Sequence, residues 1–200
     1  MSPSHSLPQP RLYNPSTDSP LLPQLARIQA ACILSDGQLA TFLPPFDMSA
    51  MTTYWQHSAR NAGVIPTLER PSGCEIVLQM APREEGEVVA GYVVLSMAWS
   101  QTGPFRGEVL KLMVSPERRR RRVARRLMGM LEDVATEKGR TMLVSFLKTL
   151  RWGLTFRFLL FFRTDQHRGS TPKSARTRRK CILSLGGRSW VLCRSTALIL

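Results

Sequence analysis

Hydrophobic and polar positions in the first part of the chain predict two helices. Residues 22–37 carry apolar side chains at near-helical spacing, and the segment ends at a glycine. Residues 48–63 form a second predicted helix, with Ser49 as its N-cap and another glycine at its end. A connection interrupted by prolines separates the two.

Three apolar segments that follow predict β-strands. Residues 74–80 and 88–99 are rich in Ile and Val, and the polar loop between them is short enough for a hairpin. Residues 107–114 form the third predicted strand. Since side chains alternate between the two faces of an unbulged strand, Glu108 and Val114 should share one face, together with Leu110 and Leu112.

The pattern changes again at Val123, where apolar side chains recur at helical spacing as far as a glycine at position 139. Residues 140–146 return to strand character. A strand–loop–helix–strand unit therefore lies at the centre of the chain. This order of elements predicts an α/β fold, an α+β sandwich in which helices flank a mixed central sheet.

The two ends of the chain differ from this central domain, which we expect to span residues 21–146. Residues 1–20 are rich in Ser and Pro and are predicted to be a disordered lead-in. Residues 147–200 show no sustained period and form a basic, atypical tail, so the C-terminal part of the fold is expected to be incomplete or disordered. A genuine basic tail and an altered reading frame both account for this composition.

Charge is distributed unevenly. The net charge is +14, but residues 1–140 hold sixteen Lys and Arg against thirteen Asp and Glu, whereas residues 141–200 hold twelve against one. The basic excess therefore lies in the tail rather than in the predicted domain, which disfavours a nucleic-acid-binding domain.

Other classes of protein are also disfavoured by the sequence. No apolar run reaches the ~20 residues of a membrane helix, and we expect no membrane partner. The four cysteines lack metal-like spacing, so no metal site is expected. With no secretory signal, the expected compartment is the cytoplasm, and the nucleus stays open.

The junction between the third strand and the following helix carries the strongest chemical signal. Its sequence, VSPERRRRRVARRLM, contains five consecutive arginines at positions 118–122. The first turn of a helix has unpaired N–H groups and a positive dipole end, so a strand that leads into a helix makes a natural anion site. Only a few residues line it, which suits a pyrophosphate better than a long polyanion.

This junction resembles motif A of the GNAT N-acetyltransferases, in which a strand ending V-x-P is followed by R/Q-x-x-G-x-G/A at the start of a helix. Residues 114–116 match the strand end, and residues 119–124 occupy the pyrophosphate loop. The resemblance spans roughly residues 25–146 in the order of elements and is sharpest over residues 107–128.

The resemblance implies transfer of an acetyl group from acetyl-CoA to an amine of a small molecule or a protein. It implies that the pantetheine arm of acetyl-CoA binds the strand backbone at Leu112, Met113 and Val114. The pyrophosphate would bind the loop residues Arg119, Arg120, Arg121, Arg122, Val123 and Ala124, with Arg125 at the margin. The amine acceptor and the oligomeric state stay open.

Glu108 is the candidate general base, because a glutamate six residues before Val114 has that role in the histone-acetylating branch of the family that the chain resembles. The alternative is a surface carboxylate that pairs with Arg106 or Lys111. Sequence reasoning leaves both interpretations open.

Two departures from the family pattern bear on activity. Arg122 stands where the motif has a loop glycine, which lets the backbone approach a phosphate without a Cβ in the way. In addition, the chain has no tyrosine after residue 146 that would act as a general acid toward the leaving thiolate.

Several other side chains have weaker signals. Tyr54, Trp55 and His57, on the second predicted helix, would line a substrate groove or simply pack, and packing is favoured. Trp99 and Phe105 flank a loop and are expected to pack as well.

Three functions remain open from the sequence. The first is an acetyltransferase. The second is a basic protein that binds nucleic acid through residues 118–126 and the tail. The alternative for Arg125 and Arg126 is that they simply form the solvated face of the helix. The third is a truncated or degenerate protein with the same fold and no activity.

Overall fold

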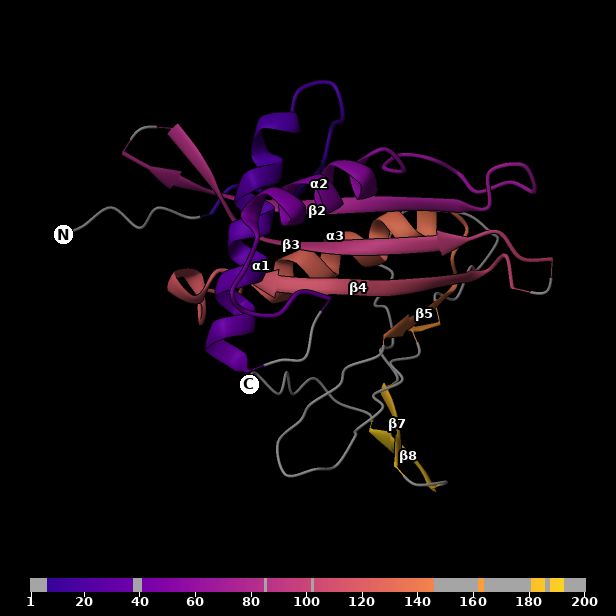
Figure 1. Cartoon of the computed structure of the whole chain (residues 1–200). Coiled ribbons are helices and arrows are strands. Elements are labelled where there is room, and N and C mark those ends of the chain that lie inside the picture. The colour runs from indigo at the N-terminus through magenta and orange to yellow at the C-terminus, as the bar shows by residue number, and fades with distance from the viewer. Residues whose placement is uncertain are drawn as a thin grey trace.

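A computed structural model of the chain shows a central β-sheet with helices on both of its faces (Figure 1). It describes residues 7–37, 41–84, 86–101 and 103–145, and the backbone of residues 162–163, 181–185 and 188–192. The α-helices are α1 (Leu22–Asp36), α2 (Met48–Ala59) and α3 (Val123–Glu137). The strands of the sheet are β1 (Arg11–Leu12), β2 (Ser72–Arg83), β3 (Gly86–Ala98), β4 (Arg106–Val114), β5 (Met142–Ser145) and β6 (Phe162–Arg163).

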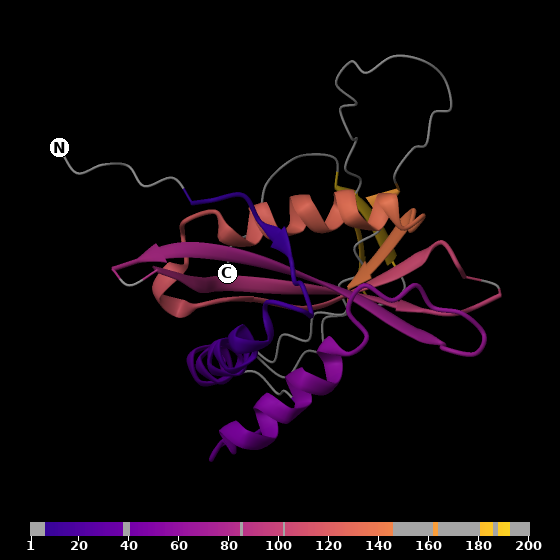
Figure 2. The same cartoon turned by 90° about the horizontal axis from the view of Figure 1, so that it is seen from above.

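The sheet is mixed, with its strands in the order β1-β2-β3-β4-β5-β6. All neighbours are antiparallel except β4 and β5, which are parallel and are connected through α3. Seen from above, α3 covers one face of the sheet, and α1 and α2 cover the other (Figure 2). The predicted α+β sandwich with a mixed central sheet is confirmed.

A hydrophobic core lies on each side of the sheet. Leu25, Trp55 and Tyr92 belong to the core beneath α1 and α2, and Leu127 and Leu131 belong to the core beneath α3. Strands β2 and β3 are buried on both faces along most of their length, which explains why their sequences are almost continuously apolar.

The N-cap of α2 lies two residues before the predicted one. The side chain of Asp47 accepts hydrogen bonds from the amides of Ser49 and Ala50, so Asp47 is the N-cap and the prediction of Ser49 was wrong. The helix ends at Ala59 rather than at residue 63, because the residues after it leave the helix to bridge β2.

Strand β4 contains a bulge near its middle. Val94 of β3 pairs with Leu110, whereas Tyr92 pairs with Met113, so one residue of β3 lies opposite two residues of β4. Lys111 lies in the bulge with a left-handed backbone, φ 50°. The alternation predicted for an unbulged strand therefore stops at Leu110.

The N-terminal segment is part of the folded domain. The disorder predicted for residues 1–20 is wrong for residues 7–20, since β1 pairs with β2 and the Tyr13 side chain is buried, and residues 1–6 lie outside the described residues. The guanidinium of Arg11 donates to the buried carboxylate of Asp18 through both of its terminal nitrogens. A short 3-10 helix, Ser19–Leu21, then leads into α1.

Arg126 attaches this N-terminal segment to α3. Its guanidinium donates to the carbonyl oxygens of Leu7, at 2.9 Å, and Pro8, and also to Oε1 of Gln79, at 3.0 Å. Gln79 is fully buried. The interpretation of Arg126 as part of a solvated face was therefore wrong, whereas its neighbour Arg125 is exposed.

The predicted tail, residues 147–200, lies mostly outside the described residues. Within it, β6 pairs antiparallel with β5, and β7 (Cys181–Leu185) forms a hairpin with β8 (Arg188–Leu192). In the part of the chain that the structure describes, no helix combines the length and apolar character needed to cross a membrane.

Replacing Arg126 should destabilise the fold far more than replacing its exposed neighbour. Arg126→Met removes the donor to the buried Gln79 amide oxygen and to the Leu7 carbonyl, and leaves the Pro8 carbonyl with only its hydrogen bond from Gln79 Nε2, so we expect the free energy of unfolding to fall by about 2 kcal/mol. Arg125→Met, the matched control, should change it by less than about 0.5 kcal/mol. Urea unfolding followed by circular dichroism measures both, and equal effects would contradict the attachment.

Candidate active site

A cradle of backbone amides forms where β4 ends and α3 begins. A single 3-10 turn, Pro116–Arg118, follows β4, and α3 starts at Val123. Within the described part of the chain, the backbone N–H groups from Arg120 to Arg125 have no hydrogen-bond acceptor. Six consecutive free amides beside the positive end of a helix dipole can bind an anionic group such as a phosphate.

Two arginines of this loop adopt a left-handed backbone. Arg120 has φ 62°, and Arg122, the N-cap residue of α3, has φ 61° and ψ 15°. Arg122 therefore takes the conformation that a glycine at this position of the motif adopts without steric cost, whereas a residue with a Cβ is strained by about 1–2 kcal/mol.

Gly91 of β3 lets the two ends of the cradle approach the sheet. A Cβ at this position would lie 2.7 Å from the carbonyl oxygen of Met113 and 3.1 Å from the Val123 side chain. The end of β4 and the start of α3 thus converge on a glycine, and a larger residue would separate them.

The side chain of Arg119 is engaged within the protein. Its guanidinium donates to both carboxylate oxygens of Asp36, at 2.8 and 3.0 Å, and to the Ser35 hydroxyl at 3.0 Å. The hydrogen bond to Asp36 raises the pKa of Arg119. Its own amide donates weakly to Pro116, at 3.5 Å, so Arg119 connects α1 to the loop and is the one predicted cradle residue whose amide has an acceptor.

One edge of β4 is open beside the cradle. Strand β5 pairs with β4 only between Arg106 and Val109, and beyond that point no described residue pairs with this edge. The predicted residues Leu112, Met113 and Val114 lie in this open part. The Val114 carbonyl accepts a hydrogen bond from the buried Cys32 thiol at 3.3 Å, so one of its backbone groups is already engaged.

Glu108 lies nearer the start of β4, opposite Ser96 of β3 and beside Val144 of β5. Among the described residues, Glu108 has neither a hydrogen-bond partner nor an ion pair, so the alternative pairing with Arg106 or Lys111 does not form. The alternation up to Leu110 puts its side chain on the face of the sheet that α1 and α2 cover.

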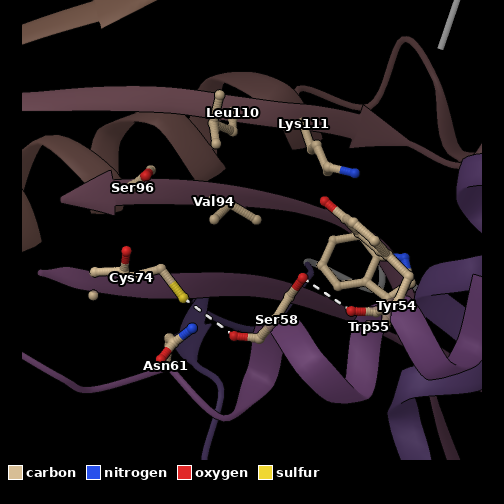
Figure 3. Close-up of a pocket in the computed structure, with 11 residues that line it drawn as sticks. Tyr54, Trp55, Ser58, Asn61, Cys74, Val94, Ser96, Leu110 and Lys111 are labelled. Atoms are coloured by element: carbon tan, nitrogen blue, oxygen red, sulfur yellow. Dashed lines mark hydrogen bonds between the residues drawn. The ribbon is translucent and has the colours of Figure 1, made fainter. Parts of the chain in front are cut away.

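A pocket with a volume of about 150 Å³ opens on this same face (Figure 3). Helix α2 and the turn after it form one wall, and β2, β3 and β4 form the floor. The lining residues are Tyr54, Trp55, Ser58, Asn61, Ser72, Gly73, Cys74, Val94, Ser96, Leu110 and Lys111.

Of the weaker candidates from the sequence, two line this pocket. Trp55 is fully buried and donates its Nε1–H to Gln29 at 2.9 Å, so it serves both the core and the pocket wall. Tyr54 packs edge-to-face against it, with ring centroids 5.9 Å apart. His57 and Phe105 are exposed and do not line the pocket.

The Cys74 thiol of the pocket is a poor nucleophile. Burial, aided by the negative charge of Glu75, raises the pKa of Cys74 to about 11. Its sulfur contacts the Ser58 carbonyl oxygen at 3.5 Å. Because the thiolate is the reactive form, a covalent acyl intermediate on Cys74 is disfavoured at neutral pH.

Sequence reasoning missed several pocket residues. Ser58 follows Tyr54 by four residues, a polar position on the inner side of α2 that the helical period could have revealed, whereas Asn61 lies in the turn after the helix and has no such signal. Lys111 interrupts an apolar strand, which is also a signal, but the bulge that turns it into the pocket depends on strand pairing.

Comparisons with known proteins identify the family to which the chain is similar. The model of the acetyltransferase (GNAT) family matches residues 38–151. The search of curated proteins found no match.

The structure is similar to several solved acetyltransferases. An N-acetyltransferase from Staphylococcus aureus Mu50 has a TM-score of 0.49 and 19% identity, with 72% of this chain and 75% of that chain covered. The PaiA N-acetyltransferase from Thermoplasma acidophilum, solved in complex with coenzyme A, has a TM-score of 0.44 and 11% identity, with coverages of 72% and 81%.

A tandem GNAT protein from the clavulanic acid biosynthesis pathway has a TM-score of 0.48 and 18% identity. The match covers 70% of this chain but only 36% of the tandem protein. The match to the family model, in contrast, takes in more than half of the chain and includes β4, the amide cradle and α3. The chain therefore belongs to the GNAT family of acetyltransferases.

Proposed function

We propose that the protein transfers an acetyl group from acetyl-CoA to an amine. The row of free amides from Arg120 to Arg125 carries the proposal, because it offers a diphosphate several donors at the positive end of a helix. The exposed arginine side chains around it add positive charge. The residues present thus fit the pyrophosphate of coenzyme A.

The open edge of β4 continues from the cradle toward the pocket. Backbone groups that face this open edge, beginning at Leu112, would hold the amides of the pantetheine arm as a neighbouring strand would, whereas those of Met113 face Tyr92 of β3. The bound acetyl-CoA supplies a reactive thioester. Because the arm runs along β4 from its end toward its middle, the thioester would lie near the bulge, beside the pocket.

Glu108 is suited to prepare the acceptor. An amine attacks a thioester only in its neutral form, and the Glu108 carboxylate can take the proton from the ammonium group, directly or through a water molecule. Its place on the face of the sheet that carries the pocket, without an ion pair to a described residue, supports this role. The neutral Cys74 thiol favours direct transfer to the amine over transfer through the enzyme.

Calorimetric titration of the full-length protein with acetyl-CoA tests the proposed function. Binding at micromolar affinity, with coenzyme A release when an amine is added, is the expected result. A DNA duplex titrated at two salt concentrations serves as the control, since affinity for nucleic acid falls steeply with salt. Salt-dependent binding to the duplex and none to acetyl-CoA would instead favour the nucleic-acid interpretation.

The conformation of the cradle can be tested by glycine substitution. Arg122→Gly removes the Cβ from a left-handed residue and should raise the free energy of unfolding by about 1 kcal/mol. Arg121→Gly, the matched control at a position without positive φ, should lower it by about 0.5–1 kcal/mol through added freedom of the unfolded chain. Urea unfolding measures both variants, and effects of the same sign would mean that the loop adopts another conformation.

Removing the charge of Glu108 should slow turnover without weakening cofactor binding. We expect Glu108→Gln to lower kcat at neutral pH by about 100-fold, the usual scale for losing a general base, and to leave the acetyl-CoA dissociation constant unchanged. Glu117→Gln, on the exposed turn after β4, is the matched control and should keep full turnover. Unchanged turnover in the Glu108 variant would remove this residue from the mechanism.

A further inference from the structure

The Lys111 side chain has an unusual environment. Its Nζ exposes less than 1 Å² to solvent and has no hydrogen-bond partner in the described part of the chain. It lies 4.0 Å from the centre of the Tyr54 ring and 5.4 Å from that of Trp55. Figure 3 shows the side chain pointing toward these two rings. A buried ammonium group is costly when it lacks an anionic partner, and two aromatic faces compensate only part of that cost.

The backbone is strained to direct this side chain into the pocket. In a regular strand, Leu110 and the residue after it would point to opposite faces of the sheet. The bulge and the φ of 50° at Lys111 instead bring both side chains to the lining of the same pocket. Such strain costs about 1–2 kcal/mol at a non-glycine residue and is typical of functional positions.

The other lining residues make the pocket complementary to an anion. None of them is acidic, and Lys111 is the only charged one. The Ser96 hydroxyl and the side-chain amide of Asn61 add polar groups. The nearby Glu75 does not neutralise Lys111, because it forms an ion pair with Lys138, at 2.7 Å, after α3 on the other face of the sheet.

We propose that the acceptor amine carries a carboxylate, and that Lys111 binds it. This inference rests on the proposed acetyl transfer and names its substrate class. The carboxylate would occupy the pocket beside Nζ, and the aliphatic part of the acceptor would pack on Tyr54 and Leu110. The amine would then lie toward Glu108, three residues away along β4, or about 10 Å at the usual rise of a strand.

Turnover of three acceptors with one chain length tests the proposal: 5-aminopentanoate, pentylamine and 1,5-diaminopentane. For the unmodified protein we expect kcat/KM for 5-aminopentanoate to exceed that for pentylamine by about 10- to 100-fold, the usual effect of a charge-assisted hydrogen bond. Lys111→Met should abolish the preference, and Lys111→Glu should reverse it in favour of the diamine. Equal rates for all three acceptors with the unmodified protein, or a preference that survives in Lys111→Met, would overturn the proposal.

The matched control is Arg83→Met, which removes one positive charge at the opposite end of β2 from the pocket residues Ser72 and Cys74. It should keep the preference for 5-aminopentanoate. Thermal melting and acetyl-CoA affinity, measured for every variant, establish that the fold is intact. If one of the two Lys111 variants fails to fold, the other carries the comparison, and Lys111→Arg, which keeps the charge, should keep the preference.

A binding measurement separates this proposal from the proposed function. Saturation-transfer NMR with 5-acetamidopentanoate and N-pentylacetamide, the acetylated forms of two acceptors, requires neither turnover nor acetyl-CoA. Stronger binding of the carboxylate in the unmodified protein, lost in Lys111→Met, supports the anion site even if the chain proves inactive. Equal binding of both compounds overturns it, even if the chain acetylates other amines.

Discussion

The unpaired backbone N–H groups at the junction of β4 and α3 are the feature on which the rest of the site depends. Backbone amides that leave a sheet normally find partners at once, because an unsatisfied donor is costly when it is removed from water. Here the left-handed residues Arg120 and Arg122 turn consecutive amides outward instead of into a continuous helix. Gly91 lets the junction lie tightly on the sheet, and Arg119 fixes it to α1. The free amides are thus held in place before any ligand arrives.

Unpaired backbone groups also mark the part of β4 that lies beside the pocket. Pairing with β5 ends at Val109, so the free backbone edge of β4 begins where its side chains Leu110 and Lys111 line the pocket. The bulge at Lys111 interrupts the ladder with β3 at this point as well. Strand β4 therefore connects the two features, with the amide cradle at its end and the pocket beside its middle.

Much of this architecture could be predicted from the sequence, because local signals and tertiary packing agree. The strand before Pro116 and the amphipathic helix from Val123 predict the junction through the spacing of their apolar residues alone. The bulge could not be predicted, since it arises from the pairing of β3 with β4 and has no local marker other than one lysine. The role of Arg126 was missed for a similar reason, because its partners Leu7 and Gln79 are far away in the sequence.

The N-terminal segment also has a consequence for how the sheet meets its surroundings. Strand β2 would otherwise present a long row of unpaired backbone groups to solvent, and such an edge is a template on which other chains can add a strand. Two pieces of this chain cover it: β1 near its middle, and the turn around Ala62 at its start. Both are too short and irregular to extend the sheet further. The ion pair of Arg11 and the hold of Arg126 thus also protect the protein against edge-to-edge aggregation.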